Sequence, residues 1–258
     1  TKYLRKVSKF AHYVKKSPEE LGEEEVKKYL VHLLEDRKLS TGTYKNYVAG
    51  IKFLYRTTLN RGEVVEKIKY PKAKIKLPVV LDLSEVRTML SVMENLKHRA
   101  VLTITYSAGL RVSETAHLKV TDIDSKRMMV RVRQGKGGKD RYTILSKTAL
   151  ESLREYWRAY RPKDWLFEGQ KEGSSICYTT IRNIFVEAKE RAGIIKPVGP
   201  HSLRHAFATH LIEAGTSLHH VQLLLGHKSP KTTTVYLHVS KMNLAQVCSP
   251  LDSIPEEL

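Results

Sequence analysis

Four side chains near the C-terminus have types and a spacing that suit chemistry on a phosphodiester. They lie in HSLRHAFATHLIEAGTSLHHVQLLLGHKSPKTTTVYLHV, residues 201–239, as His201, Arg204, His227 and Tyr236. His201 and Arg204 share a face of the predicted helix, because residues three apart are neighbours there. The planar guanidinium fork can donate two parallel hydrogen bonds to phosphate oxygens. A surface arginine beside a structural histidine accounts for this pair equally well. Other residues are therefore needed to distinguish a phosphate site from an ordinary surface pair.

Tyr236 is a candidate nucleophile whose chemistry depends on its surroundings. A phenol has a pKa of about 10, so nearby cations are needed to favour the phenolate. His227 follows Gly226, which is expected to end an apolar helix, and Tyr236 is expected on a short helix beyond it. An isolated helical tyrosine is usually a packing or surface residue, so Tyr236 carries weight only within the whole set.

The composition favours a polyanionic partner. The 258 residues include 45 Lys and Arg against 27 Asp and Glu, a formal net charge of +18, while 41% hydrophobic residues are ordinary for a globular protein. Basic side chains gain free energy by releasing the counterions condensed on phosphates, so the charge favours nucleic acid. A basic protein without such a partner remains the alternative.

The cysteine content and the hydropathy of the chain indicate which covalent cross-links, metal sites and cellular locations to expect. Cys177 and Cys248 are the two cysteines, and each lacks a neighbouring thiol, so neither a disulfide framework nor a four-ligand zinc site is indicated. No leader and no membrane-length apolar run stand out, so we expect no export and no membrane partner. The expected location is the cytoplasm, in association with the nucleoid.

The elements that must position these residues divide into two parts. Residues 70–80, YPKAKIKLPVV, place two prolines among lysines without helical periodicity, as in an exposed connector. We expect the first domain to be helical and to carry the denser positive charge. The proposed division is 1–70 for this domain, 71–80 for the linker, 81–240 for the second domain and 241–258 for a C-terminal tail.

Helical periodicity marks the first part. Its apolar residues recur at steps of three and four, which predicts one buried helical stripe made of Tyr44, Tyr47, Val48, Ile51, Leu54 and Tyr55. Core packing is the preferred role for the tyrosines over contact with bases. Lys45, Lys52 and Arg56 are expected to face outward, either toward DNA phosphates or simply toward solvent.

The second part is expected to be mainly α-helical with one small antiparallel β-sheet. Asp82 and Glu85 form a capping-box start for a helix, and Gly109 ends the next apolar helix. In RMMVRVRQGKGGKDRYTIL, alternating valines and arginines precede a glycine-rich turn, which predicts a β-hairpin. Helical periodicity then returns and persists.

Six residues, in order along the chain, resemble the tyrosine recombinase or phage integrase family. They are Arg111 in AGLRVSE, Lys136 in GKGGKDR, His201 and Arg204 in HSLRH, His227 in LLGHKS, and Tyr236. The resemblance extends from residue 81 to about 240, and the basic helical part resembles that family's core-binding domain. It implies two domains that close on DNA as a C-clamp, the second being catalytic.

The resemblance also implies a role for each residue. Arg111 and Arg204 would hold the nonbridging oxygens of the scissile phosphate, and both histidines would add hydrogen bonds. Tyr236 would attack, Lys136 would protonate the departing 5′ oxygen, and the enzyme would stay joined to the 3′ phosphate. The covalent link conserves the bond energy, so no cofactor is expected.

Several other residues have two candidate roles or a supporting role. Glu114 is either an acceptor that orients the active-site cations or a surface carboxylate, while His205 matches a family position and is expected to be structural. Lys139 competes with Lys136 as the acid, and both Lys139 and Arg141 are expected to contact DNA.

Metal chemistry is not expected. His201, His205 and His210 lack a carboxylate or cysteine at a usual spacing, and the GKGG turn lacks the pattern of a nucleotide-binding loop. Two-metal chemistry needs clustered carboxylates, whereas Asp122, Asp124 and Asp140 are expected to serve turns.

From this resemblance we expect a site-specific recombinase that acts on double-stranded DNA through a 3′-phosphotyrosyl intermediate and Holliday-junction strand exchange. The resemblance implies a homotetramer on two duplexes, with the tail docking on a neighbouring protomer or on its own domain. The interval from Lys136 to His201 leaves little room for the insert of integron integrases, which favours a Xer-like or mobile-element integrase. The alternatives are a topoisomerase IB-like relaxing enzyme and a non-catalytic DNA-binding relative.

Overall fold

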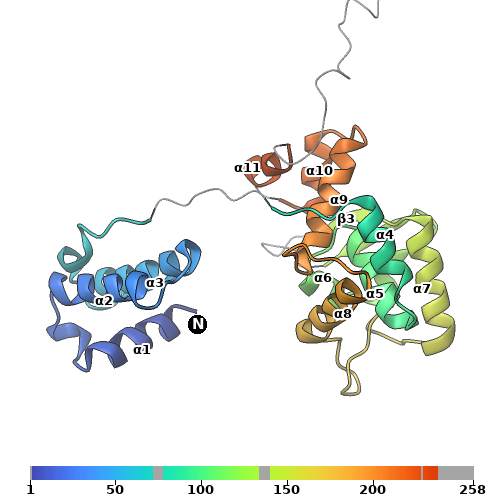
Figure 1. Ribbon diagram of the computed structural model, residues 1–258. Coiled ribbons are helices and arrows are strands. Elements are labelled where there is room, and N and C mark those ends of the chain that lie inside the picture. Colours follow the sequence, from blue (N-terminus) through green and yellow to red (C-terminus); the bar gives the residue numbers. More distant parts are fainter. Residues whose placement is uncertain (1, 72–77, 134–139, 228, 238–258) are drawn as a thin grey trace, which may run out of the picture. The chain divides into compact units, whose positions relative to one another are not determined.

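The chain folds into two units, each with its own core (Figure 1). This computed structural model describes residues 2–71, 78–133, 140–227 and 229–237. The first unit comprises Thr1–Lys76 and the second Leu77–Leu258, so the division falls inside the segment that the sequence indicates as a linker.

The described part of the first unit is entirely helical. Its elements are α1 (Lys2–Val14), η1 (Pro18–Glu20), α2 (Glu23–Glu35), α3 (Thr41–Phe53), the π-helical turn η2 (Leu54–Thr58) and η3 (Gly62–Val65). Ser40 caps α3 by accepting a hydrogen bond from the Thr43 amide at 3.4 Å. Helix α3 packs against α1 and α2, and their aromatic side chains fill the core.

The predicted stripe on α3 and η2 is confirmed, but one of its flanking lysines differs from expectation. Five of the six stripe residues are buried and Leu54 is partly buried. Lys45 and Arg56 are exposed, whereas Lys52 is only 8% exposed. The expectation that Lys52 faces outward was therefore wrong: it follows Ile51 at the edge of the stripe, and its ammonium lies 5.1 Å above the ring of Tyr70.

The second unit opens with helices whose ends follow the sequence signals. Its first elements are α4 (Leu83–Ser91), α5 (Leu96–Ser107), α6 (Val112–Ala116) and η4 (Val120–Asp122). The Asp82 amide donates to Glu85 Oε2 at 2.7 Å, which confirms the capping box. Gly109, at φ +58°, follows α5, and a Cβ there would lie 2.3 Å from the ring of Phe207. A glycine is therefore required for both its conformation and its space.

The predicted hairpin is present and belongs to a three-stranded antiparallel sheet. Its strands, in the order β1-β2-β3, are β1 (Ile123–Asp124), β2 (Met129–Val132) and β3 (Arg141–Ile144). Val132 pairs with Arg141 and Val130 with Thr143. The two-residue strand β1 is too short to produce a periodic sequence signal, so the sequence did not predict it.

Helices build the rest of the second unit. They are α7 (Lys147–Tyr160), α8 (Tyr178–Arg191), α9 (His201–Glu213), α10 (Leu218–Leu225), the one-turn α11 (Pro230–Thr233) and η5 (Thr234–Tyr236). Helix α9 packs against α4, α5 and α10, and it is buried along most of its length. Among the described residues, no helix combines the length and apolar character needed to cross a membrane.

Candidate active site

Helix α9 brings the HSLRH residues to one end of the second unit. His201 begins the helix, and Arg204 and His205 follow within the next turn. His201 is exposed, yet desolvation by the surrounding protein, followed by the charges of Arg204 and Arg111, lowers its pKa. A histidine with a lowered pKa is neutral at neutral pH. It can therefore accept a proton, and while it remains neutral it can donate a hydrogen bond without adding charge to the site.

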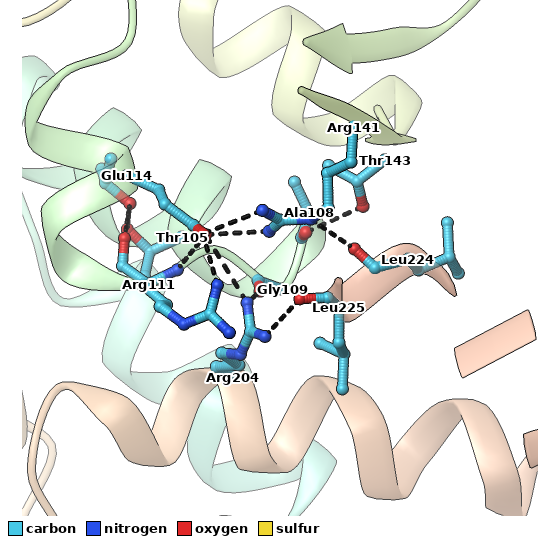
Figure 2. A network of polar contacts seen from close by, with 11 residues as sticks. Thr105, Ala108, Gly109, Arg111, Glu114, Arg141, Thr143, Arg204, Leu224 and Leu225 are labelled. Carbon is cyan, nitrogen blue, oxygen red and sulfur yellow. Dashed lines mark hydrogen bonds and ion pairs between the residues drawn. The ribbon is translucent and has the colours of Figure 1, made fainter. Parts of the chain in front are cut away.

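Arg204 is buried and fixed by backbone carbonyls. Its Nη1 donates to the Gly109 carbonyl at 2.7 Å, and its Nη2 donates to the Leu225 carbonyl at 2.5 Å (Figure 2). Burial and the nearby charge of Arg111 lower the pKa of Arg204 to about 10, which leaves it protonated at neutral pH. Its guanidinium is thus a fixed cation whose direction is set by the turn after α5 and by the end of α10.

Glu114 connects three arginines. Arg111, the N-cap of α6, donates to it from its amide at 2.8 Å and from Nη1 at 2.6 Å. Arg141 at the start of β3 donates to both carboxylate oxygens, each at 2.8 Å, and Arg204 Nη1 lies 3.5 Å from Oε2 (Figure 2). Of the two roles that the sequence left open for Glu114, this geometry favours orienting the cations.

The charge balance of this cluster suits an anion. Burial would raise the pKa of Glu114, but the hydrogen bond and charge of Arg141, the Arg111 amide and the charge of Arg204 lower it to about 2. One carboxylate therefore faces three guanidiniums, and the cluster carries excess positive charge. Arg111 is the most exposed of the three, with 22% of its side chain accessible. A phosphate diester can balance this excess.

Tyr236 lies beside two histidines. Its hydroxyl is 3.0 Å from Nδ1 of His205, and its ring is nearly parallel to that of His227, at 14° with centroids 6.3 Å apart. His227 Nδ1 is 2.9 Å from the Thr233 hydroxyl. Tyr236 is only 3% exposed, and its burial raises the pKa of the phenol while Arg204 and Arg111 act in the opposite direction. Deprotonation therefore requires help from a proton acceptor or from the cations.

The structure gathers most of the residues that the sequence singled out. The members of this group are His201, Arg204, His205, His227, Tyr236, Arg111 and Glu114. Lys136 and Lys139 lie outside the described residues. Lys45, Lys52 and Arg56 belong to the first unit.

Arg141 differs from the expectation of a DNA contact. Only 11% of its side chain is exposed, and its guanidinium binds Glu114 and the carbonyl of Leu224. The alternation of β3 carried the missed signal: Tyr142 and Ile144 are exposed, while Thr143 points inward and donates to the Ala108 carbonyl. Arg141 shares the inward face with Thr143, because side chains two apart in a strand point the same way.

Acidic side chains of the second unit have other partners than a metal ion. Within the described ranges, no group of three or more His, Cys, Asp or Glu residues could hold a metal ion. Asp122 binds Arg133 at 2.6 Å and Asp140 binds Arg131 at 2.7 Å. Asp124 accepts from the amides of Lys126 and Arg127, as a turn residue does.

Two family profiles match the chain, one for each unit. Residues 79–243 match the Phage integrase family, and residues 1–62 match the Phage integrase N-terminal SAM-like domain. A putative integrase/recombinase, y4qK, of Sinorhizobium fredii is 46% identical over 254 residues, covering 98% of this chain and 82% of the relative. Tyrosine recombinase XerD of Listeria innocua is 32% identical over 267 residues, covering 95% and 89%.

Solved structures resemble the chain across both units. The XerH site-specific recombinase bound to a palindromic difH substrate, in a post-cleavage complex, has a TM-score of 0.79 at 25% identity, covering 93% of this chain and 76% of that one. A lambda integrase dimer bound to a COC′ core site has a TM-score of 0.77 at 19% identity, covering 95% and 90%. The second likeness concerns the fold alone.

Proposed function

The chain belongs to the phage integrase family and is a tyrosine recombinase, and from this premise we propose that the residues around α9 cut and rejoin DNA at a specific site. One observation carries the assignment of the site. Tyr236 binds His205, which follows Arg204 on α9, so the candidate nucleophile and a fixed phosphate ligand belong to one cluster. A topoisomerase-like relaxing enzyme is not favoured by the relatives.

The phosphate of the scissile bond would bind between Arg111 and Arg204. Both guanidiniums are held by Glu114, so little reorganisation is needed as negative charge shifts onto the nonbridging oxygens. His201 at the start of α9 and His227 beside Tyr236 would donate further hydrogen bonds. Arg111, as the more exposed of the two arginines, would meet the DNA first.

Cleavage would be an in-line displacement at phosphorus. The Tyr236 oxygen forms a bond to phosphorus while the bond from phosphorus to the 5′ oxygen breaks. The phenolic proton passes to Nδ1 of His205, its hydrogen-bond partner at 3.0 Å. Lys136 gives a proton to the departing 5′ oxygen, leaving a free 5′ hydroxyl and a 3′-phosphotyrosyl bond. Attack by the 5′ hydroxyl of another strand reverses these steps, so ligation requires no ATP.

The DNA partner would be a duplex with a specific recombination site. XerH is solved on a DNA site of this kind, and the net charge of +18 suits a polyanion. Exposed Lys45 and Arg56 of the first unit would contact phosphates. Exchange of four strands through a Holliday junction would require four protomers on two duplexes. The C-terminal tail, residues 241–258, lies outside the described residues, and it would dock on a neighbouring protomer or on its own domain. A Xer-like or mobile-element integrase acting in the cytoplasm is the proposed subtype.

A nicked half-site provides the test. Cleavage next to the nick releases a short 5′-hydroxyl fragment that diffuses away, so the covalent complex accumulates. Peptide mapping should place the adduct on Tyr236, and sequencing of the attached DNA should reveal the site. Relaxation of a supercoiled plasmid without that site, with no exchanged products, would instead favour the topoisomerase. Site binding without any adduct would favour a non-catalytic relative.

A further inference from the structure

Two arginine side chains donate hydrogen bonds to backbone carbonyls at the C-terminal end of α10. A helix leaves its last four carbonyls without intrahelical partners. The Gly226 and His227 amides donate to the carbonyls of Leu223 and Gln222, at 3.0 and 3.2 Å. The carbonyls of Leu224 and Leu225 accept instead from Arg141 Nε at 2.9 Å and from Arg204 Nη2 at 2.5 Å (Figure 2).

All three guanidinium nitrogens of Arg141 are engaged. Nη1 and Nη2 donate to the two oxygens of Glu114, and Nε donates to Leu224. The side chain also packs closely on the turn after α10, because a Cβ at Gly226 would lie 2.8 Å from Arg141 Cδ. Gly226 has φ +64°, so its glycine suits both the left-handed turn and the approach of this arginine.

These contacts join four elements at one point. Arg141 belongs to β3, Glu114 to α6, and the carbonyls to the end of α10, from which the chain continues directly into His227. Through Glu114, Arg141 is also linked to Arg111 and to Arg204 of α9. A change at Arg141 would therefore alter the directions of groups that bind phosphate, without removing any of them.

We propose that Arg141 is a positioning residue for DNA cleavage: it fixes Arg111 and Arg204 through Glu114, and it fixes the end of α10 that precedes His227. The inference rests on the proposed function. A direct contact between Arg141 and a DNA phosphate is the competing role, and the two roles differ in what they do to affinity. A phosphate contact contributes to binding and to its salt dependence, whereas a positioning contact acts on the rate of the bound complex.

Two substitutions separate these roles. Arg141→Lys keeps the charge but cannot reach both Glu114 oxygens and Leu224, and Arg141→Gln removes the charge. With the nicked half-site, we expect single-turnover adduct formation at saturating DNA to slow by about 10- to 100-fold in both variants, the size of effect caused by misplaced groups. The Kd should stay within about twofold of wild type, and its salt slope should not change. A salt slope smaller by about one unit in Arg141→Gln would overturn the proposal in favour of a phosphate contact.

The final adduct yield distinguishes positioning from misfolding. Slower formation that reaches the wild-type yield indicates misplaced groups, whereas a reduced yield at the wild-type rate indicates inactive protein and overturns the proposal. Arg158→Lys, at an exposed position of α7, is the matched control and should match the wild-type rate. If wild-type protein forms no adduct, the proposed function itself is contradicted. If wild-type protein and the Arg141 variants cleave at the same rate, the proposed function stands and only the role of Arg141 is contradicted.

A double-mutant cycle tests the route through Glu114. If Arg141 acts largely through this carboxylate, Arg141→Lys should slow cleavage much less in a Glu114→Gln background than in wild type. Additive effects on the rate would show that the two residues act independently and would overturn this coupling.

Discussion

Nδ1 of His205 lies 3.0 Å from the hydroxyl oxygen of Tyr236. His205 directly follows Arg204 on α9, so one helical turn carries both the proposed phosphate ligand and the hydrogen-bond partner of the proposed nucleophile. Tyr236 itself is on the separate helix η5. The distance between these two groups therefore depends on how η5 packs against α9, and in the proposed mechanism this packing places His205 beside the attacking oxygen.

The first prediction concerns the pH dependence of cleavage. Burial, then the charges of His201 and Arg204, lower the pKa of His205 from 6.5, so His205 is neutral at pH 7 and can accept the phenolic proton. Single-turnover cleavage should fall as the pH decreases through this lowered pKa, because protonated His205 cannot accept. His205→Asn can hold the hydroxyl but cannot take its proton, so cleavage at pH 7 should slow on the order of 100-fold. In this variant, the decrease of the cleavage rate at low pH that is caused by protonation of His205 should also disappear.

The comparison needs a histidine control, because His201, whose pKa is also lowered, lies near the site. His219→Asn, at an exposed position of α10, should retain the wild-type rate and pH profile. If the cleavage rate of His205→Asn decreased at low pH as that of wild type does, another group would be responsible for the decrease, and His205 would not be the proton acceptor.

The second prediction concerns the nucleophile. Tyr236→Phe keeps the buried ring but loses the hydroxyl and its bond to His205, at a cost of about 1 kcal/mol in the free energy of unfolding. We expect near-normal binding of the DNA site, measured by fluorescence anisotropy, and no covalent adduct on a denaturing gel. An adduct that persists in this variant would assign the nucleophile to a different residue.

Local sequence signals predicted the elements that carry the site. The capping box at Asp82, the glycine after α10 and the alternation of the hairpin each depend on residues close together in sequence. Such local preferences survive folding when the tertiary structure agrees with them. The sequence could therefore place His201 and Arg204 on a helix and His227 just after the end of another.

Long-range contacts account for what the sequence did not reveal. Glu114 binds Arg141, 27 positions further along the chain, and Arg204 binds Gly109, 95 positions before it. The spacing of residues in the sequence does not predict contacts between residues so far apart. An outward-facing Lys52, in contact with DNA phosphates or with solvent, is expected because lysines are usually exposed. Instead Lys52 is buried, and its ammonium lies above the ring of Tyr70. The bond between His205 and Tyr236 also depends on how η5 meets α9, which no local pattern predicts.

The third prediction tests the shape of the phosphate ligand. Arg204→Lys retains a positive charge but loses the fork that binds Gly109, Leu225 and, in the proposed complex, two phosphate oxygens. Cleavage of the nicked half-site should slow by about 100-fold or more, as for loss of one preorganised donor to a developing charge. A near-normal rate would show that charge alone is sufficient at this position.

The fourth prediction concerns affinity. Because binding is expected to release counterions from DNA phosphates, log Kd should rise steeply and linearly with log salt concentration. The charge-removing substitutions Lys45→Gln and Arg56→Gln each remove one exposed cation and should each reduce the slope by about one unit if the residue contacts a phosphate. Unchanged slopes would mean that the two cations only solvate the first unit.

The last prediction concerns stability toward acid. The pKa of Glu114 falls from 4.5 to about 2 on folding, so its ionised form stabilises the native state above about pH 4.5 and this stabilisation is lost as the pH falls toward 2. At pH 7 the shift corresponds to a stabilisation on the order of 3 kcal/mol. Urea unfolding followed by tryptophan fluorescence reports on the second unit alone, because Trp157 and Trp165 are the two tryptophans of the chain.

Glu114→Gln should lower the free energy of unfolding at pH 7 by roughly that amount, because it leaves Arg141 and Arg204 buried without their counter-charge. It should also flatten the decline between pH 4.5 and 2, since the titrating group is gone. Glu151→Gln, at an exposed position of α7, is the matched control and should follow the wild-type curve. If Glu114→Gln instead kept the full acid sensitivity of wild type, other carboxylates would govern the acid stability of the second unit, and the arginine cluster would not depend on this charge.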